Sequence, residues 1–89
     1  MSPMPTILIV EDEARMRRLL ELDLAHAGFQ TLSAPDAETA LDLLRREHVD
    51  LALTDLKLPG MSGLEFLQSA KRISAALPVI VMTAYGTVE

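Results

Sequence analysis

The sequence contains no cysteine, which excludes disulfide bonds and thiolate metal sites. It has no tryptophan and only two phenylalanines and one tyrosine, so its core must be built mainly from aliphatic side chains. Lysine and arginine are also scarce: eight basic residues stand against 13 acidic ones, for a formal net charge of −5. Because nucleic-acid binding needs a basic surface to neutralise phosphates, this balance argues against direct contact with nucleic acid.

Long apolar runs are absent as well. The N-terminal stretch MSPMPTILIVEDE has no basic segment, and its apolar run is too short for a signal peptide or a membrane span. We therefore expect a cytoplasmic protein without membrane contact. The chain has 89 residues, of which 49% are hydrophobic, so we expect one small globular domain over residues 1–89.

Short apolar segments alternate with helical patterns along the chain. Segments rich in β-branched or apolar residues predict strands at residues 6–10, 29–32, 49–54 and 79–82. Helices are predicted between them. This alternation is typical of an α/β fold in which a doubly wound parallel sheet carries helices on both faces. Right-handed crossovers allow the first strand to lie between the second and the third.

Each predicted helix has a recognisable start and an apolar face. The first follows Glu11, Asp12 and Glu13 and stops before Gly28, since glycine is favoured just after a helix end. Pro35 suits the first turn of the second, which should end near Glu47 or His48. The third begins with the capping box Ser62-Gly63-Leu64-Glu65.

The expected apolar faces are, in order, Met16, Leu19, Leu20 and Leu24; Ala37, Ala40, Leu41 and Leu44; and Phe66, Leu67, Ala70 and Ile73. Arg15, Arg17 and Arg18 are expected on the solvated side of the first helix.

Acidic residues cluster at the predicted carboxyl ends of strands, the edge at which open parallel sheets bind ligands. Glu11 and Asp12 follow the first strand and Asp55 follows the third. Such charges repel unless a cation compensates them, and no lysine or arginine is an obvious partner. A few oxygen ligands favour Mg²⁺. The alternative is that the first acids only cap a helix and that Asp55 only begins a turn.

Three segments carry a resemblance to a known family: ILIVEDE (residues 7–13), LALTDLKLPGMSG (residues 51–63) and PVIVMTAYG (residues 78–86). In this order the chain resembles the receiver domain of two-component response regulators, which has a flavodoxin-like fold. The wording TAYGTVE is similar to receivers attached to AAA+ enhancer-binding transcriptional activators.

The resemblance implies a phosphoacceptor in signalling rather than an enzyme. Asp55 would accept a phosphoryl group from a phosphohistidine on a sensor histidine kinase. Mg²⁺ would be held by Asp12, Asp55 and the backbone carbonyl of Lys57, with Glu11 acting through water. Thr83 would be the switch hydroxyl that moves toward the phosphoryl group.

The chain departs from the family at its C-terminal end. Receivers continue with a helix, a strand and a helix, and a lysine after that strand pairs with the phosphoryl group. Here the only lysines are Lys57 and Lys71, and neither matches it. We therefore expect a truncated receiver that self-associates through an open fourth strand and an uncovered sheet face.

Two other functions stay open. A Mg²⁺-dependent phosphohydrolase could use an aspartyl-phosphate intermediate, but that class has a second acid two residues after the nucleophile, where this chain has Lys57. The third possibility is an interaction fragment that is never phosphorylated.

Overall fold

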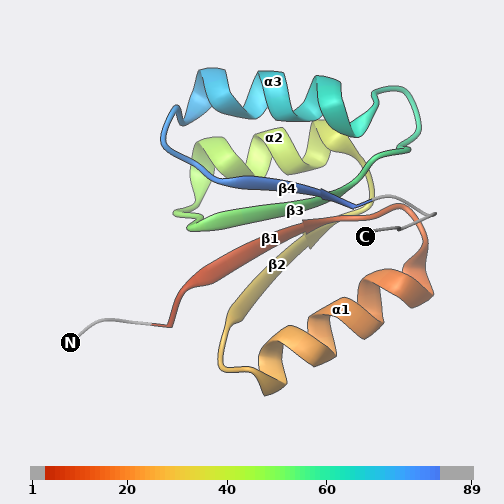
Figure 1. Ribbon diagram of the computed structural model, residues 1–89, viewed down its shortest axis with the longest axis vertical. Coiled ribbons are helices and arrows are strands. Elements are labelled where there is room, and N and C mark those ends of the chain that lie inside the picture. Colours follow the sequence, from red (N-terminus) through yellow and green to blue (C-terminus); the bar gives the residue numbers. More distant parts are fainter. Residues whose placement is uncertain (1–3, 83–89) are drawn as a thin grey trace, which may run out of the picture.

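A parallel four-stranded sheet with the order β2-β1-β3-β4 forms the centre of the computed structural model, which describes residues 4–82 (Figure 1). Its strands are β1 (Thr6–Val10), β2 (Gln30–Ala34), β3 (Leu51–Asp55) and β4 (Val79–Met82), and the helices are α1 (Ala14–His26), α2 (Ala37–Arg46) and α3 (Gly63–Ile73). Figure 1 shows α2 and α3 on one face of the sheet and α1 on the other. The predicted doubly wound α/β fold, with β1 between β2 and β3, is therefore confirmed.

The second and third strands reach further than the sequence predicted. β2 continues through Ser33 and Ala34 because these residues pair with Ile9 and Val10 of β1. β3 begins two residues later than expected and includes Asp55, which pairs with Met82 of β4. Asp55 is thus the last residue of a strand rather than the first residue of a loop.

The placement of Pro35 in the first turn of the second helix was wrong. Asp36 is the N-cap of α2, and its Oδ1 accepts a hydrogen bond of 2.7 Å from the Thr39 N–H. Side-chain caps of this kind fix where a helix starts, so Pro35 lies outside α2. α2 also ends at Arg46, because Glu47 has an extended backbone. The capping box of Ser62 and Glu65 at the start of α3 is present as predicted.

The main core lies between the sheet and the pair α2 and α3. Leu8 and Val10 of β1 and Ala52 of β3 point to this side and are completely buried. Phe66 of α3 is the largest fully buried side chain among the described residues. Burial of such a side chain stabilises a fold by about 1.5–3 kcal/mol. The predicted inner faces of these helices are also found, with the following residues buried: Ala37, Ala40, Leu41, Phe66 and Ala70.

Among residues 4–82, the elements cover the other sheet face only in part. α1 packs against β1 and β2, and Ile7 and Ile9 are buried beneath it. Met16 and Leu19, predicted on the inner face of this helix, are 42% and 56% exposed. Ile80 of β4 is 50% exposed. The apolar face predicted for α1 was therefore only partly right, because α1 lies over one half of the sheet and not over β3 and β4 (Figure 1).

None of the helices within residues 4–82 combines the length and the apolarity that crossing a membrane requires.

The first residue of α3, Gly63, packs directly against the end of the strand that carries Asp55. Its N–H donates a hydrogen bond of 2.7 Å to the Leu56 carbonyl. A Cβ at this position would clash with the Asp55 carbonyl oxygen and would lie 2.9 Å from the Leu56 Cα. Only glycine lets α3 begin against the end of β3.

We predict that Gly63→Ala lowers the free energy of unfolding, measured by urea denaturation, by about 1–3 kcal/mol because backbone atoms must move apart. The amide chemical shifts of Asp55 and Leu56 should change as well. Gly60→Ala, in the loop before α3, is the comparison. A Cβ there meets no atom within 4 Å, but the φ of 76° strains an alanine, so some loss of stability is expected without a change in the Asp55 and Leu56 chemical shifts. Unchanged stability and unchanged Asp55 shifts in Gly63→Ala would contradict the prediction.

Candidate functional site

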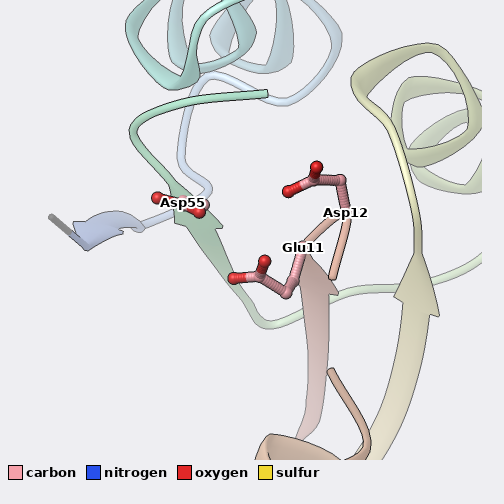
Figure 2. A group of neighbouring side chains, drawn as sticks. All are labelled: Glu11, Asp12 and Asp55. Atoms are coloured by element: carbon pink, nitrogen blue, oxygen red, sulfur yellow. The ribbon is translucent and has the colours of Figure 1, made fainter. Parts of the chain in front are cut away.

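The carboxyl ends of β1 and β3 lie side by side and bring the predicted acids together. Val10 and Thr54 are partners in the sheet register, so Glu11 follows one strand where Asp55 ends the other. Figure 2 shows Glu11, Asp12 and Asp55 with their carboxylates turned toward the same space. Each can offer one carboxylate oxygen such that these oxygens lie within 4.8 Å of one another. The predicted convergence of the three acids is confirmed.

Glu11 is the most deeply placed of the three. It is 5% exposed, and its Oε2 accepts a hydrogen bond of 3.0 Å from the Glu13 N–H. Burial is the main cause that raises the pKa of Glu11, and the charges of Asp55 and Asp12 add to it, whereas the Glu13 N–H acts in the opposite direction. Ionisation of Glu11 therefore lowers the free energy of unfolding.

Within residues 4–82, none of these three carboxylates forms an ion pair with a basic side chain. Like charges this close favour a shared cation, and an all-oxygen donor set of few ligands suits Mg²⁺. The residues present therefore fit a magnesium site. Their chemistry would also allow Mg²⁺ to keep open positions for water or a phosphoryl oxygen.

Glu13 does not cap α1 with its side chain. Glu13 is the N-cap residue, and its side chain makes no capping hydrogen bond. Asp55 does take part in a turn, since its Oδ1 accepts a long hydrogen bond of 3.4 Å from the Lys57 N–H. That contact uses one oxygen of Asp55 and leaves the other available.

Two predicted site groups are not settled by this geometry. The Lys57 carbonyl as a metal ligand stays a prediction, although Lys57 follows Asp55 in the loop as expected. Thr83, the predicted switch hydroxyl, lies outside the described residues.

Arg17 is a site neighbour that the sequence interpretation missed, because it was assigned to a solvated face. Its Nη1 donates a hydrogen bond of 2.8 Å to the Glu11 carbonyl and lies 3.5 Å from the Asp12 carbonyl. The tilt of helical side chains toward the N-terminus could have indicated this reach. Arg17 contacts backbone oxygens of the site and none of its carboxylates.

We predict that Glu11→Gln stabilises the metal-free protein at neutral pH by on the order of 1 kcal/mol, because a buried charge is removed and Gln can still accept from the Glu13 N–H. A raised pKa means that the cost of the Glu11 charge is present above that pKa and is lost as the pH falls through it. The gain should therefore shrink on acidification. Urea denaturation in a chelator across a pH series measures it.

Glu13→Gln is the control for this substitution, because Glu13 is an exposed neighbour with the same change of charge. An equal gain in both variants, or a gain in Glu11→Gln that is constant with pH, would contradict the role of burial.

Comparison with known proteins identifies the family. Residues 7–89 match the family described as "Response regulator receiver domain". Sporulation initiation phosphotransferase F of Bacillus subtilis is 43% identical over 83 residues, which are 93% of this chain and 67% of that protein. Regulatory protein AtoC of Escherichia coli is 40% identical over 89 residues, which are 100% of this chain but only 19% of that protein.

Solved structures agree with this result. The response regulator protein TrrA of Thermotoga maritima, in complex with Mg²⁺ and BeF, superposes with a TM-score of 0.88 at 34% identity, covering 93% of this chain and 72% of that one. The structure of histidine kinase ThkA in complex with TrrA also matches, with a TM-score of 0.88 at 32% identity, covering 97% of this chain and 74% of that one. The family match spans most of the chain, and the fold and the acidic strand ends agree with it; the chain therefore belongs to the receiver domain family of two-component response regulators.

Proposed function

We propose that Asp55 accepts a phosphoryl group from a phosphohistidine on a sensor histidine kinase and that the chain serves as a signalling module, not as a turnover enzyme. The observation that carries this proposal is the convergence of Glu11, Asp12 and Asp55 at one sheet edge. The Mg²⁺ and BeF bound to TrrA, and the complex of TrrA with ThkA, support it by analogy.

The proposed reaction is an in-line phosphoryl transfer. A carboxylate oxygen of Asp55 attacks phosphorus and forms an O–P bond, while the P–N bond breaks and the imidazole nitrogen keeps the electron pair and takes up a proton. Asp12, Asp55 and the Lys57 carbonyl would hold Mg²⁺, with Glu11 acting through water. When bound, this ion supplies positive charge that offsets the charge of the phosphoryl oxygens.

The phosphoryl group carries a charge of about −1.5 to −2, but it replaces the single negative charge of the Asp55 carboxylate. The net change at this end of the sheet would therefore be about −0.5 to −1. We propose that Thr83, which follows β4, reports this change by moving its hydroxyl toward the phosphoryl group. We further propose a cytoplasmic location and, by similarity to regulators such as AtoC, a role in transcription regulation through an AAA+ activator.

The phosphohydrolase alternative has less support. Its second acid would lie two residues after Asp55, and the structure has Lys57 there, with an exposed side chain. The two functions differ in outcome, since a receiver keeps the phosphoryl group for a measurable time and a hydrolase releases phosphate with turnover.

We predict that acetyl phosphate with Mg²⁺ adds one phosphoryl group to the wild-type chain, detected by intact mass, and that Asp55→Asn abolishes the adduct because the nucleophilic oxygen is replaced by an amide. Asp42→Asn is the control, because Asp42 is exposed on α2 and its substitution removes the same charge. Sustained phosphate release would favour the hydrolase. No adduct in the wild type would favour an interaction fragment and overturn the proposal.

We also propose that two copies of the chain associate through the partly covered sheet face and β4. Met16, Leu19 and Ile80 are exposed on the α1 side of the sheet, and within residues 4–82 β4 pairs only with β3. Burial of these side chains and pairing of the open edge would both favour a dimer.

We predict that Ile80→Glu shifts the chain toward the monomer in sedimentation velocity, because a charge would have to be buried at the interface. Leu64→Glu is the matched control: Leu64 is 57% exposed on α3, on the opposite side of the sheet. A wild-type chain that stays monomeric at high concentration would contradict the association.

A further inference from the structure

Arg17 lies in the first part of α1 and reaches back over the loop that carries the acids. Its backbone N–H makes a helical hydrogen bond of 2.9 Å to the Glu13 carbonyl. Its guanidinium donates to the Glu11 carbonyl at 2.8 Å and lies 3.5 Å from the Asp12 carbonyl. One side chain therefore joins α1 to two consecutive peptide groups of the candidate site.

Helix formation does not account for a basic residue at this place. The N-terminal end of a helix carries a partial positive charge, so basic side chains near it are unfavourable. The first turn of α1 contains no acidic residue, although Glu11, Asp12 and Glu13 directly precede it. Arg15 and Arg18 are also basic, so what distinguishes Arg17 is the pair of carbonyls that its guanidinium contacts.

The carbonyls that Arg17 contacts belong to the residues at which the chain leaves the sheet. The Glu11 N–H is still bonded to the Ala34 carbonyl of β2 at 3.1 Å, while its side chain accepts from the Glu13 N–H. Arg17 adds the third restraint, on the carbonyl side. These bonds hold the Glu11 backbone at both its N–H and its carbonyl, and the Asp12 backbone at its carbonyl.

We propose that Arg17 is a positioning residue that orients the Glu11–Asp12 backbone, so that both carboxylates are held ready for a cation before it binds. The inference rests on the proposed function of this site. Because the guanidinium donates to backbone carbonyls, it leaves the carboxylate oxygens free for the ion. A side chain that paired with those carboxylates would compete with the ion.

The sign of the effect on cation binding separates positioning from simple electrostatics. Removal of a positive charge near a cation site should by itself strengthen cation binding. Loss of a residue that orients metal ligands weakens it, typically about 10–100-fold. Arg18 provides the matched control: it is on the same helix, carries the same charge, and pairs with Glu21 at 3.2 Å instead of with the site loop.

The test measures Mn²⁺ binding by electron paramagnetic resonance in the wild type, Arg17→Met and Arg18→Met. We expect Arg17→Met to bind about tenfold more weakly and Arg18→Met to bind as well as the wild type or more tightly. Equal or tighter binding in Arg17→Met, or equal weakening in both variants, would overturn the inference.

Amide hydrogen exchange in the metal-free protein gives a second readout that does not depend on the ion. The Glu13 amide should exchange faster in Arg17→Met than in Arg18→Met, because the loop loses its restraint. If Arg17→Met does not fold, Arg17→Lys provides the test. Both contacts come from the terminal Nη1, and the Lys nitrogen lies one atom closer to the backbone, so the ammonium falls short of the two carbonyls. Faster exchange is therefore expected, and unchanged exchange overturns the inference. Absent Mn²⁺ binding in the wild type would instead refute the proposed function, and the exchange comparison would still decide the role of Arg17.

Discussion

Repulsion among three carboxylates at one sheet edge is the constraint around which this structure is arranged. Glu11, Asp12 and Asp55 offer oxygens within 4.8 Å of one another, and no ion pair within residues 4–82 offsets their charge. Such an arrangement lowers stability, because Glu11 is buried as well as surrounded by like charges. A cation bound among the three carboxylates would offset this repulsion.

The elements behind the cluster keep it rigid. Thr54 is completely buried one residue before Asp55, and its Oγ1 donates a hydrogen bond of 3.0 Å to the Asp55 carbonyl. Gly63 brings the start of α3 against the same peptide, and Arg17 restrains the other strand end. The site is therefore built on a packed sheet and on the starts of two helices. Rigid elements of this kind hold the groups that contact a substrate in a fixed geometry.

The two sheet faces differ in how fully they are covered. The side of α2 and α3 forms a continuous core around Phe66, whereas α1 leaves Ile80 and parts of its own apolar face open. The acidic cluster lies at the end of strands shared by both faces. Asp55 itself lies against the start of α3 through its carbonyl and is paired with Met82 of β4 in the sheet.

Local patterns in the sequence determined the order of the helices and strands and the place of the acidic cluster. Alternating apolar segments predict the existence and order of every described helix and strand, although Asp36 and not Pro35 marks the start of α2. Acids placed after two strands predict the site, because a parallel sheet brings those strand ends to one edge. Other features depended on the tertiary structure. The pairing of Asp55 with Met82 extended β3, and the half-open face of the sheet left Leu19 exposed, since both depend on which elements lie alongside. The role of Arg17 also emerged only in three dimensions, because a pattern of charges along a helix does not tell which distant carbonyl oxygens a guanidinium can reach.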